Sequence, residues 1–284
     1  VADLTVEEMR DPLPDAVAEA FAAAGLPAEY GGEHSNGATH MSVVGFRDGS
    51  YVELISTVES GTRSPWWDAS IRGDGGPCAW AVGVDDIDEA SATLRDRGVT
   101  VEGPARFQRF REDGTLVEWD LTFLGGGEPG ATLPFLISDR TPRERRVQPT
   151  GSLGDSPVTG VDTVVLGVPD EADAVERLTR AFDVEVGGRE AVEHFGTEAV
   201  SLVDAPIVVV APGGDRWLAE RLERFGPGPV AYVLGTDPER GSPVEAVERD
   251  SLFGRDVGWI PPTAPVGRHY LGVVESDAHG ADPG

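Results

Sequence analysis

Alternating apolar and polar residues in residues 39–56 predict a β-hairpin. Two runs rich in Val, Ile, Phe and Tyr flank Asp48-Gly49, a pair that suits a tight turn with positive φ. With these two as the turn residues, Phe46 faces Tyr51 and Val44 faces Glu53. Since side chains alternate between the two faces of a strand, one face carries Met41, Val43, Val52 and Leu54, and the other carries His40, Ser42, Val44, Phe46, Tyr51, Glu53 and Ile55. Glu53, among apolar neighbours, fits a solvated sheet face or, as we expect, a carboxylate that points into a cavity and has a metal or Arg partner.

Residues 107–123 predict a second hairpin around Asp113-Gly114. The pairing places Arg109 opposite Glu118. The more apolar face is expected to pack against a helix over 87–97, where Leu94 meets Trp119. The other face carries Arg109, Arg111, Glu118 and Asp120. It is either solvated or, by the parallel with the first hairpin, part of the cavity wall near Glu53; we expect the cavity wall, with Arg109 lining it.

An internal repeat organises the chain. A strand end, an Asp and a helix start recur at Asp3, Asp86, Asp170 and Asp237. The pattern predicts helices over 15–24, 87–97 and 171–182, a capping box near residue 5, and only a short helix over 243–249. Further strands are expected over 133–138, 199–203, 206–211, 257–260 and 269–275. The domain division is then 1–142, a linker over 143–157, a second divergent half over 158–275 and a tail over 276–284.

The composition limits which binding partners are plausible but says little about the reaction. The 284 residues carry a net charge of −27, and all 23 basic residues are Arg. This bias is typical of proteins from salt-loving archaea, because salt near 1 M shortens the screening length to about 3 Å. The charge argues against nucleic acid and anionic membranes. The single Cys78 rules out a disulfide framework, and with no apolar run of about 18 residues we expect a cytoplasmic protein.

The order of these motifs resembles the vicinal oxygen chelate superfamily, in its glyoxalase-like branch. The resemblance rests on THMSVVGFRDGSYVELIS, GPCAWAVGVDDIDEASATLRDRGV, REDGTLVEWDLTF with LPFLIS and, more weakly, VDTVVLGVPDEADAVERL. It implies an α+β fold in which repeated βαβββ units pair into cupped, mostly antiparallel sheets with helices outside. It also implies a cavity for a small molecule. From the acidic, Lys-free composition we expect the source organism to be a haloarchaeon.

The resemblance further implies a divalent metal held by side chains from the first and last strands of paired units. By position, Glu53 matches the carboxylate of the first unit. The first-strand ligand of that unit would lie before Val1, and we expect the biological chain to begin upstream of this residue. The other matching positions, Ala79, Thr163 and Ala231, supply no ligand, nor do residues 133–138. Whether the protein binds a divalent metal as cofactor therefore stays open, and Glu53 is the one candidate ligand in the sequence.

Two functions remain open from the sequence. The first is a glyoxalase-like enzyme of the lyase, isomerase or dioxygenase kind, with Glu53 as the catalytic residue. The expected substrate-binding residues are His40, Tyr51, Arg109, Arg111, Glu118, Trp66 and Trp67. The alternative is a non-catalytic small-molecule-binding protein that has lost its metal site. Trp66 and Trp67 either stack on a substrate or plug the core, and His40 is expected at the cavity rim. His34 belongs to a loop that is either a substrate lid or, as we expect, a plain surface loop. The expected partner is a small-molecule ligand. A homodimer is a second possibility.

Overall fold

The protein has an α+β fold, as expected, in which strands form curled sheets. The computed structural model describes residues 13–59, 61–73, 75–111, 113–214, 216–241, 245–263 and 268–276. Its helices are α1 (Leu13–Ala23), α2 (Asp68–Gly73), α3 (Ile87–Asp96), α4 (Arg143–Arg146), α5 (Glu171–Phe182) and α6 (Trp217–Phe225), with 3-10 turns at Gly151–Gly154, Glu193–Phe195 and Pro238–Arg240. The predicted capping box near residue 5 and the expected strand before Val1 lie outside the described residues.

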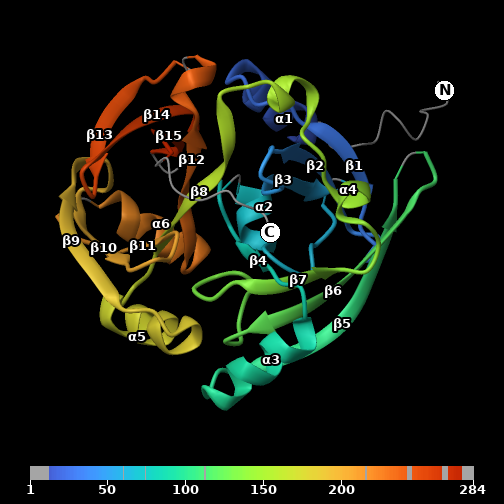
Figure 1. Cartoon of the computed structure of the whole chain (residues 1–284), viewed down its shortest axis with the longest axis horizontal. Coiled ribbons are helices and arrows are strands. Elements are labelled where there is room, and N and C mark those ends of the chain that lie inside the picture. Colours follow the sequence, from blue (N-terminus) through green and yellow to red (C-terminus); the bar gives the residue numbers. More distant parts are fainter. Residues whose placement is uncertain are drawn as a thin grey trace.

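The first half of the chain forms two sheets. One holds β1 (Glu29–Glu33), β2 (Thr39–Gly45) and β3 (Tyr51–Thr57) in this order. The other holds β4 (Ala81–Gly83), β5 (Val101–Phe110), β6 (Leu116–Leu124) and β7 (Phe135–Asp139) in the order β4-β7-β6-β5. β4 runs parallel to β7, and the other pairs are antiparallel. The two sheets curve around a common space on the right of Figure 1.

The second half forms one curled sheet of eight strands (Figure 1). Its strands are β8 (Val158–Gly167), β9 (Val186–Val192), β10 (Thr197–Leu202), β11 (Ile207–Val210), β12 (Gly228–Thr236), β13 (Glu248–Leu252), β14 (Arg255–Thr263) and β15 (His269–Glu275). Their order is β13-β14-β15-β12-β8-β11-β10-β9. Helix α6 lies inside this ring, and its Trp217 and Leu218 are buried with Phe195 and Trp259. Apolar side chains therefore fill the interior of the second half.

The Asp-capped helices form where the repeat predicts them. Asp86 accepts a hydrogen bond from the Glu89 amide at 2.9 Å, and Asp170 accepts one from the Asp173 amide at 3.0 Å. Each cap satisfies one of the amides that the first turn of a helix leaves free. The short helix predicted over 243–249 is wrong in its described part, because β13 begins at Glu248.

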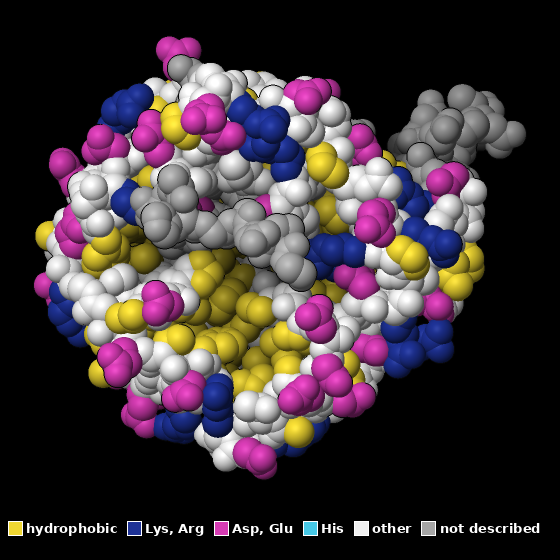
Figure 2. All heavy atoms as spheres, viewed as in Figure 1, with side chains coloured by type: hydrophobic (Ala, Val, Ile, Leu, Met, Phe, Trp, Pro, Cys, Tyr) yellow, Lys and Arg dark blue, Asp and Glu magenta, His cyan; other side chains and the backbone are white. Residues whose placement is uncertain are grey.

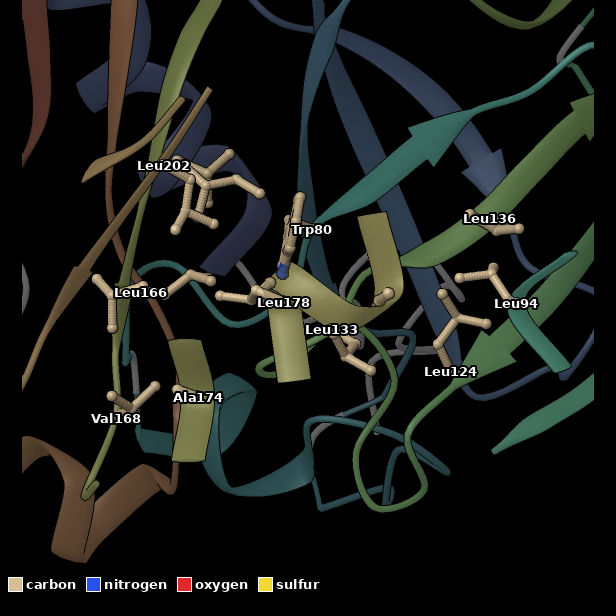
Figure 3. Packing of buried hydrophobic residues seen from close by; sticks show 14 of the residues in the cluster. Trp80, Leu94, Leu124, Leu133, Leu136, Leu166, Val168, Ala174, Leu178 and Leu202 are labelled. Carbon is tan, nitrogen blue, oxygen red and sulfur yellow. The ribbon is translucent and has the colours of Figure 1, made fainter. Parts of the chain in front are cut away.

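One hydrophobic core joins the two halves. Trp80, Leu94 and Leu136 from the first half pack with Leu166 and Leu178 from the second half, and all five are buried. Figure 3 shows these side chains converging from strands and helices of both halves. On the surface, acidic side chains are scattered over one face of the molecule, and hydrophobic ones gather in a recess near its centre (Figure 2).

The register of the first hairpin differs from the prediction by one residue. The Phe46 amide donates to the Ser50 carbonyl at 3.0 Å, so the loop has three residues and Gly49 takes a φ of +84°. Three-residue loops with a left-handed Gly are common in hairpins. Glu53 therefore pairs with Val43. Its face carries Met41, Val43, Tyr51 and Ile55, whereas His40, Ser42, Val44 and Phe46 lie on the other face with Val52 and Leu54.

The second hairpin shows the same shift. The Arg111 amide donates to the Thr115 carbonyl at 3.0 Å, Gly114 has a φ of +81°, and Arg109 pairs with Val117. Arg109 consequently shares a face with Val117 and Trp119. The predicted contact of Leu94 with Trp119 is wrong, because Leu94 belongs to the core that joins the halves and Trp119 packs with Val117, Leu121 and Ile137.

Candidate functional site

The first half holds a cavity with two adjoining compartments, and Val161, Val164, Tyr232 and Tyr270 of the second half complete the wall of one of them. The hairpin compartment, about 110 Å³, lies between strands β2 and β3 and strands β5 to β7. The edge compartment, about 350 Å³, follows the edges of β3 and β4. Seven residues border both compartments: Tyr51, Glu53, Ile55, Trp67, Phe135, Ile137 and Arg146. Glu53 and Arg146 are the charged members of this shared set, so the cavity's polar chemistry is concentrated where the compartments meet.

Glu53 reaches the cavity because odd-numbered residues of β3 point inward. Its side chain is 32% exposed, and Oε1 lies 3.2 Å from Nε2 of His34. Burial acts to raise the pKa of Glu53, but the hydrogen bond and charge of His34 and the charges of Arg109 and Arg146 outweigh burial. The net pKa of Glu53 lies below its ordinary value, so the carboxylate is ionised at neutral pH.

His34 is held in place by the loop between β1 and β2. The His34 amide donates to the Thr39 carbonyl at 2.8 Å, and Nδ1 lies 2.8 Å from the Thr39 hydroxyl. Asn36 donates to the same hydroxyl at 3.1 Å. This network fixes the imidazole with Nε2 toward Glu53. The interpretation of His34 as part of a plain surface loop is therefore wrong, because His34 lines the hairpin compartment. A loop of Ser, Asn and Gly carries no sequence pattern that fixes where the His34 side chain points.

Two arginines lie beside this pair. Arg109 is 4% exposed and donates to the carbonyls of Gly31 and Arg146. Arg146 forms a two-point ion pair with Asp139, with Nε–Oδ1 at 2.5 Å and Nη2–Oδ2 at 2.8 Å. Burial acts to lower the pKa of Arg146, but the hydrogen bond to Asp139 and the charges of Tyr51, Asp139 and Glu53 together outweigh burial, and the pKa lies above its ordinary value. Sequence reasoning missed Arg146 because it falls within the expected linker, where α4 forms.

Aromatic side chains form the remaining wall. The Tyr51 hydroxyl accepts a hydrogen bond from Arg146 Nη1 at 2.8 Å, and burial raises the pKa of Tyr51. Trp66 and Trp67 both line the hairpin compartment. Trp66 packs 5.1 Å from Phe123, centroid to centroid, and Trp67 donates to the Pro129 carbonyl at 2.7 Å. Both indole rings therefore pack in the core and also border the cavity.

Three expected site residues lie elsewhere. His40 is buried on the opposite face of β2 and contacts Tyr30 edge-to-face at 5.9 Å. Arg111 donates to the Arg145 carbonyl at 3.0 Å, outside the cavity lining. Glu118 binds Arg106 at 2.5 Å on the outer face of β6. The one-residue register shift explains His40 and Glu118, since it exchanges the faces of their strands relative to Glu53 and Arg109.

The side chains around Glu53 do not fit a divalent metal site. Glu53 and His34 are the two donors that meet there, and the described residues contain no cluster of three or more His, Cys, Asp or Glu side chains suited to a metal. The charges of Arg109 and Arg146 act on the same carboxylate. Zinc and other transition-metal sites in proteins usually have three or more protein donors, and two meet here.

Comparisons with known proteins agree with this architecture. The profile of a family described as a glyoxalase-like domain matches residues 11–182. A hypothetical protein from Staphylococcus aureus superposes with a TM-score of 0.58 at 13% identity, covering 90% of this chain and 92% of that one. A triple mutant of 4-hydroxymandelate synthase from Streptomyces coelicolor gives 0.55 at 14% identity, covering 96% and 91%. No curated protein matches the sequence. No helix among the described residues is long and apolar enough to cross a membrane.

Proposed function

The chain belongs to the glyoxalase-like domain family, and on that premise we propose that it is a small-molecule enzyme of the lyase or isomerase kind. The proposed reaction transfers a proton at a carbon next to a carbonyl group. Glu53 is the acid–base residue, and the substrate lies in the hairpin compartment. The single observation that supports this proposal is the Glu53–His34 pair at the junction of the two compartments.

In this proposal Glu53 removes the proton and becomes a carboxylic acid, while the substrate becomes an enolate. Its low pKa keeps Glu53 ionised before the reaction, and His34 Nε2 holds the carboxylate in position. The buried guanidinium of Arg109 stabilises the negative charge that develops on the substrate oxygen. Return of the proton to another carbon or face completes an isomerisation, and loss of a leaving group completes a lyase reaction.

The dioxygenase alternative receives less support from the same residues. Such chemistry needs a redox metal held by several protein donors, and the described residues near Glu53 offer two. One specific observation favours the alternative function, a non-catalytic binding protein. Most contacts of Arg109 and Arg146 go to protein oxygens, so both cations also have a structural role.

Solvent hydrogen exchange tests the proposal without a known substrate. The protein is incubated in D₂O with a panel of small 2-oxo and 3-oxo carboxylates, and loss of the C–H signal is followed by proton NMR before and after treatment with EDTA. Exchange above the protein-free rate that survives EDTA supports proton transfer by protein side chains.

Two results would contradict this proposal. Exchange that disappears with EDTA and returns with one equivalent of a divalent ion would identify a metal-dependent enzyme. Saturable ligand binding in a thermal-shift assay, with no exchange for any bound compound, would favour the non-catalytic binding protein.

A further inference from the structure

The backbone of Trp67 has an unusual conformation. Its φ is +57°, in the left-handed region, which bulky residues rarely adopt because the side chain crowds the backbone. Such conformations persist only where surrounding contacts hold them, and they cluster at ligand sites. Trp67 lines the hairpin compartment. The contacts that hold Trp67 therefore help to set the shape of this compartment.

Two neighbouring residues of one loop hold Trp67. The Trp67 amide donates to Oε2 of Glu128 at 2.7 Å, and the indole N–H donates to the carbonyl of Pro129 at 2.7 Å. The Trp67 carbonyl accepts a hydrogen bond from the Ile71 amide at 2.9 Å, in the first turn of α2. The backbone and the ring of Trp67 are thus tied separately, and the carboxylate of Glu128 ties the backbone.

The loop that carries Glu128 connects β6 with β7 and has a firm base. The Trp80 amide donates to the Gly130 carbonyl at 3.1 Å, and the Trp80 indole donates to the Ala131 carbonyl at 3.2 Å. A Cβ on Gly130 would lie 2.7 Å from the Trp80 carbonyl oxygen, so the loop packs directly on this backbone. Trp80 belongs to the core that joins the halves. Glu128 is exposed, but it projects from a loop that the core holds in place.

The ring of Trp67 belongs to the aromatic wall of the hairpin compartment. Its centroid lies 6.4 Å from that of Phe135 and 5.9 Å from that of Trp66, and both neighbours line the same compartment. In the proposed function, Glu53 and Arg109 act on the reacting carbon and oxygen. The aromatic wall is then left to contact the apolar part of the ligand, where ring contacts add to the binding energy.

We propose that Glu128 is a positioning residue for the hairpin compartment: its carboxylate holds Trp67 in the left-handed conformation and so fixes the indole that contacts the ligand. Glu128 lines neither compartment, so it acts through Trp67. Without the carboxylate, the Trp67 backbone loses this tie, relaxes from its φ of +57° and moves the ring away from Phe135. A Gln side chain offers an oxygen that accepts the same hydrogen bond.

NMR of the full chain without ligand tests the hold on Trp67. Glu128→Ala is expected to speed hydrogen–deuterium exchange of the Trp67 amide at least about tenfold and to shift the Trp67 indole N–H signal, which Trp67→Phe identifies by its loss. Glu128→Gln should stay close to wild type in both. Glu102→Ala, at another exposed glutamate, is the control and should change neither.

Three results of this comparison would overturn the proposal. The first is a Trp67 amide and indole that are unchanged in Glu128→Ala. The second is a Gln variant that is altered as much as the Ala variant. The third is a Glu128→Ala protein that unfolds in urea well before wild type, which would give Glu128 a general structural role.

The effect on the ligand rests on the proposed function and is measured in the D₂O exchange assay. For a compound that wild type exchanges, Glu128→Ala is expected to raise KM about 2–10-fold with kcat unchanged, since the ring contact contributes to binding alone. Glu128→Gln should restore KM. A fall in kcat at unchanged KM, or an unchanged KM with a displaced Trp67, would overturn the positioning role. Lack of exchange by wild type for every compound contradicts the proposed function, and the NMR comparison still decides whether Glu128 positions Trp67.

Discussion

Glu53 shows what a single residue can and cannot reveal in sequence. An acidic residue in the middle of an apolar strand predicts a cavity-facing carboxylate, and the structure gives it a partner in His34 at 3.2 Å. The partner itself was not predictable, because a loop of Ser, Asn and Gly carries no period that fixes where His34 points. Arg146 was not predicted as a site residue for a similar reason. It lies in a segment whose composition resembles a linker, and long-range packing against Tyr51 and Asp139 makes it buried.

The depressed pKa of Glu53 has a consequence for stability. A carboxyl group whose pKa is lower in the folded than in the unfolded state stabilises the fold above the unfolded value of about 4.3, and this contribution is lost as the pH falls through the folded value. We expect the difference in free energy of unfolding between wild type and Glu53→Gln to favour wild type less as the pH drops from about 5 to below 4. Urea denaturation at several pH values measures it, and a difference that grows toward low pH would contradict the assignment.

The Asp139–Arg146 pair should be important for stability. The side chains are 16% and 5% exposed, so Asp139→Asn leaves a buried guanidinium without its counter-charge. We expect a loss of about 3–5 kcal/mol in the free energy of unfolding. Glu176→Gln, which removes the exposed partner of Arg180 on α5, is the matched control and should change it by less than about 1 kcal/mol. Similar losses for the two variants in urea denaturation would be inconsistent with a buried pair.

At the scale of elements, the sequence predicts the positions of the helices correctly but not the registers of the two hairpins. Asp86 and Asp170 mark helix starts because a carboxylate caps the free amides of the first turn wherever the helix packs. Asp-Gly is less specific, since it suits both two-residue turns and three-residue loops with a left-handed Gly. Both hairpins use the longer loop, and a one-residue shift exchanges every face. Arg109 and Glu53 nevertheless line one compartment, because both hairpins shift in the same way.

The cap of α3 gives an element-scale test. Asp86→Ala removes the acceptor for the Glu89 amide and is expected to lower the free energy of unfolding by about 1 kcal/mol. Asp86→Asn keeps an acceptor at the same position and should restore most of the loss. Guanidinium denaturation of the three proteins measures the effect, and an Asn variant as unstable as the Ala variant would argue against capping.

At the scale of the whole molecule, the two halves differ in what fills them. The sequence predicts strands and helices in both halves, but not that α6 carries Trp217 into the second half while the first half keeps a cavity. This difference depends on contacts between distant segments. The same holds for the core that joins the halves, where Trp80 meets Leu178 (Figure 3).

That shared core predicts joint unfolding. Leu178 is fully buried, and Leu178→Ala is expected to cost about 2–5 kcal/mol. Because the core includes residues of both halves, hydrogen exchange should accelerate in β6 as well as in β11. Val203→Ala, at a position 42% exposed, is the control and should change the free energy of unfolding by about 0.5 kcal/mol or less. Acceleration confined to the second half would show that the halves unfold independently.

The role of Glu53 as the acid–base residue is tested most directly by comparing Glu53→Gln with wild type in the D₂O exchange assay. Gln keeps the shape of the side chain but cannot accept the proton, so the exchange rate of a bound carbonyl acid should fall about 10²–10⁴-fold. Glu33→Gln, on the exposed end of β1, should exchange like wild type. A Glu53→Gln protein that binds the compound and still exchanges it at the wild-type rate would contradict the central role given to Glu53.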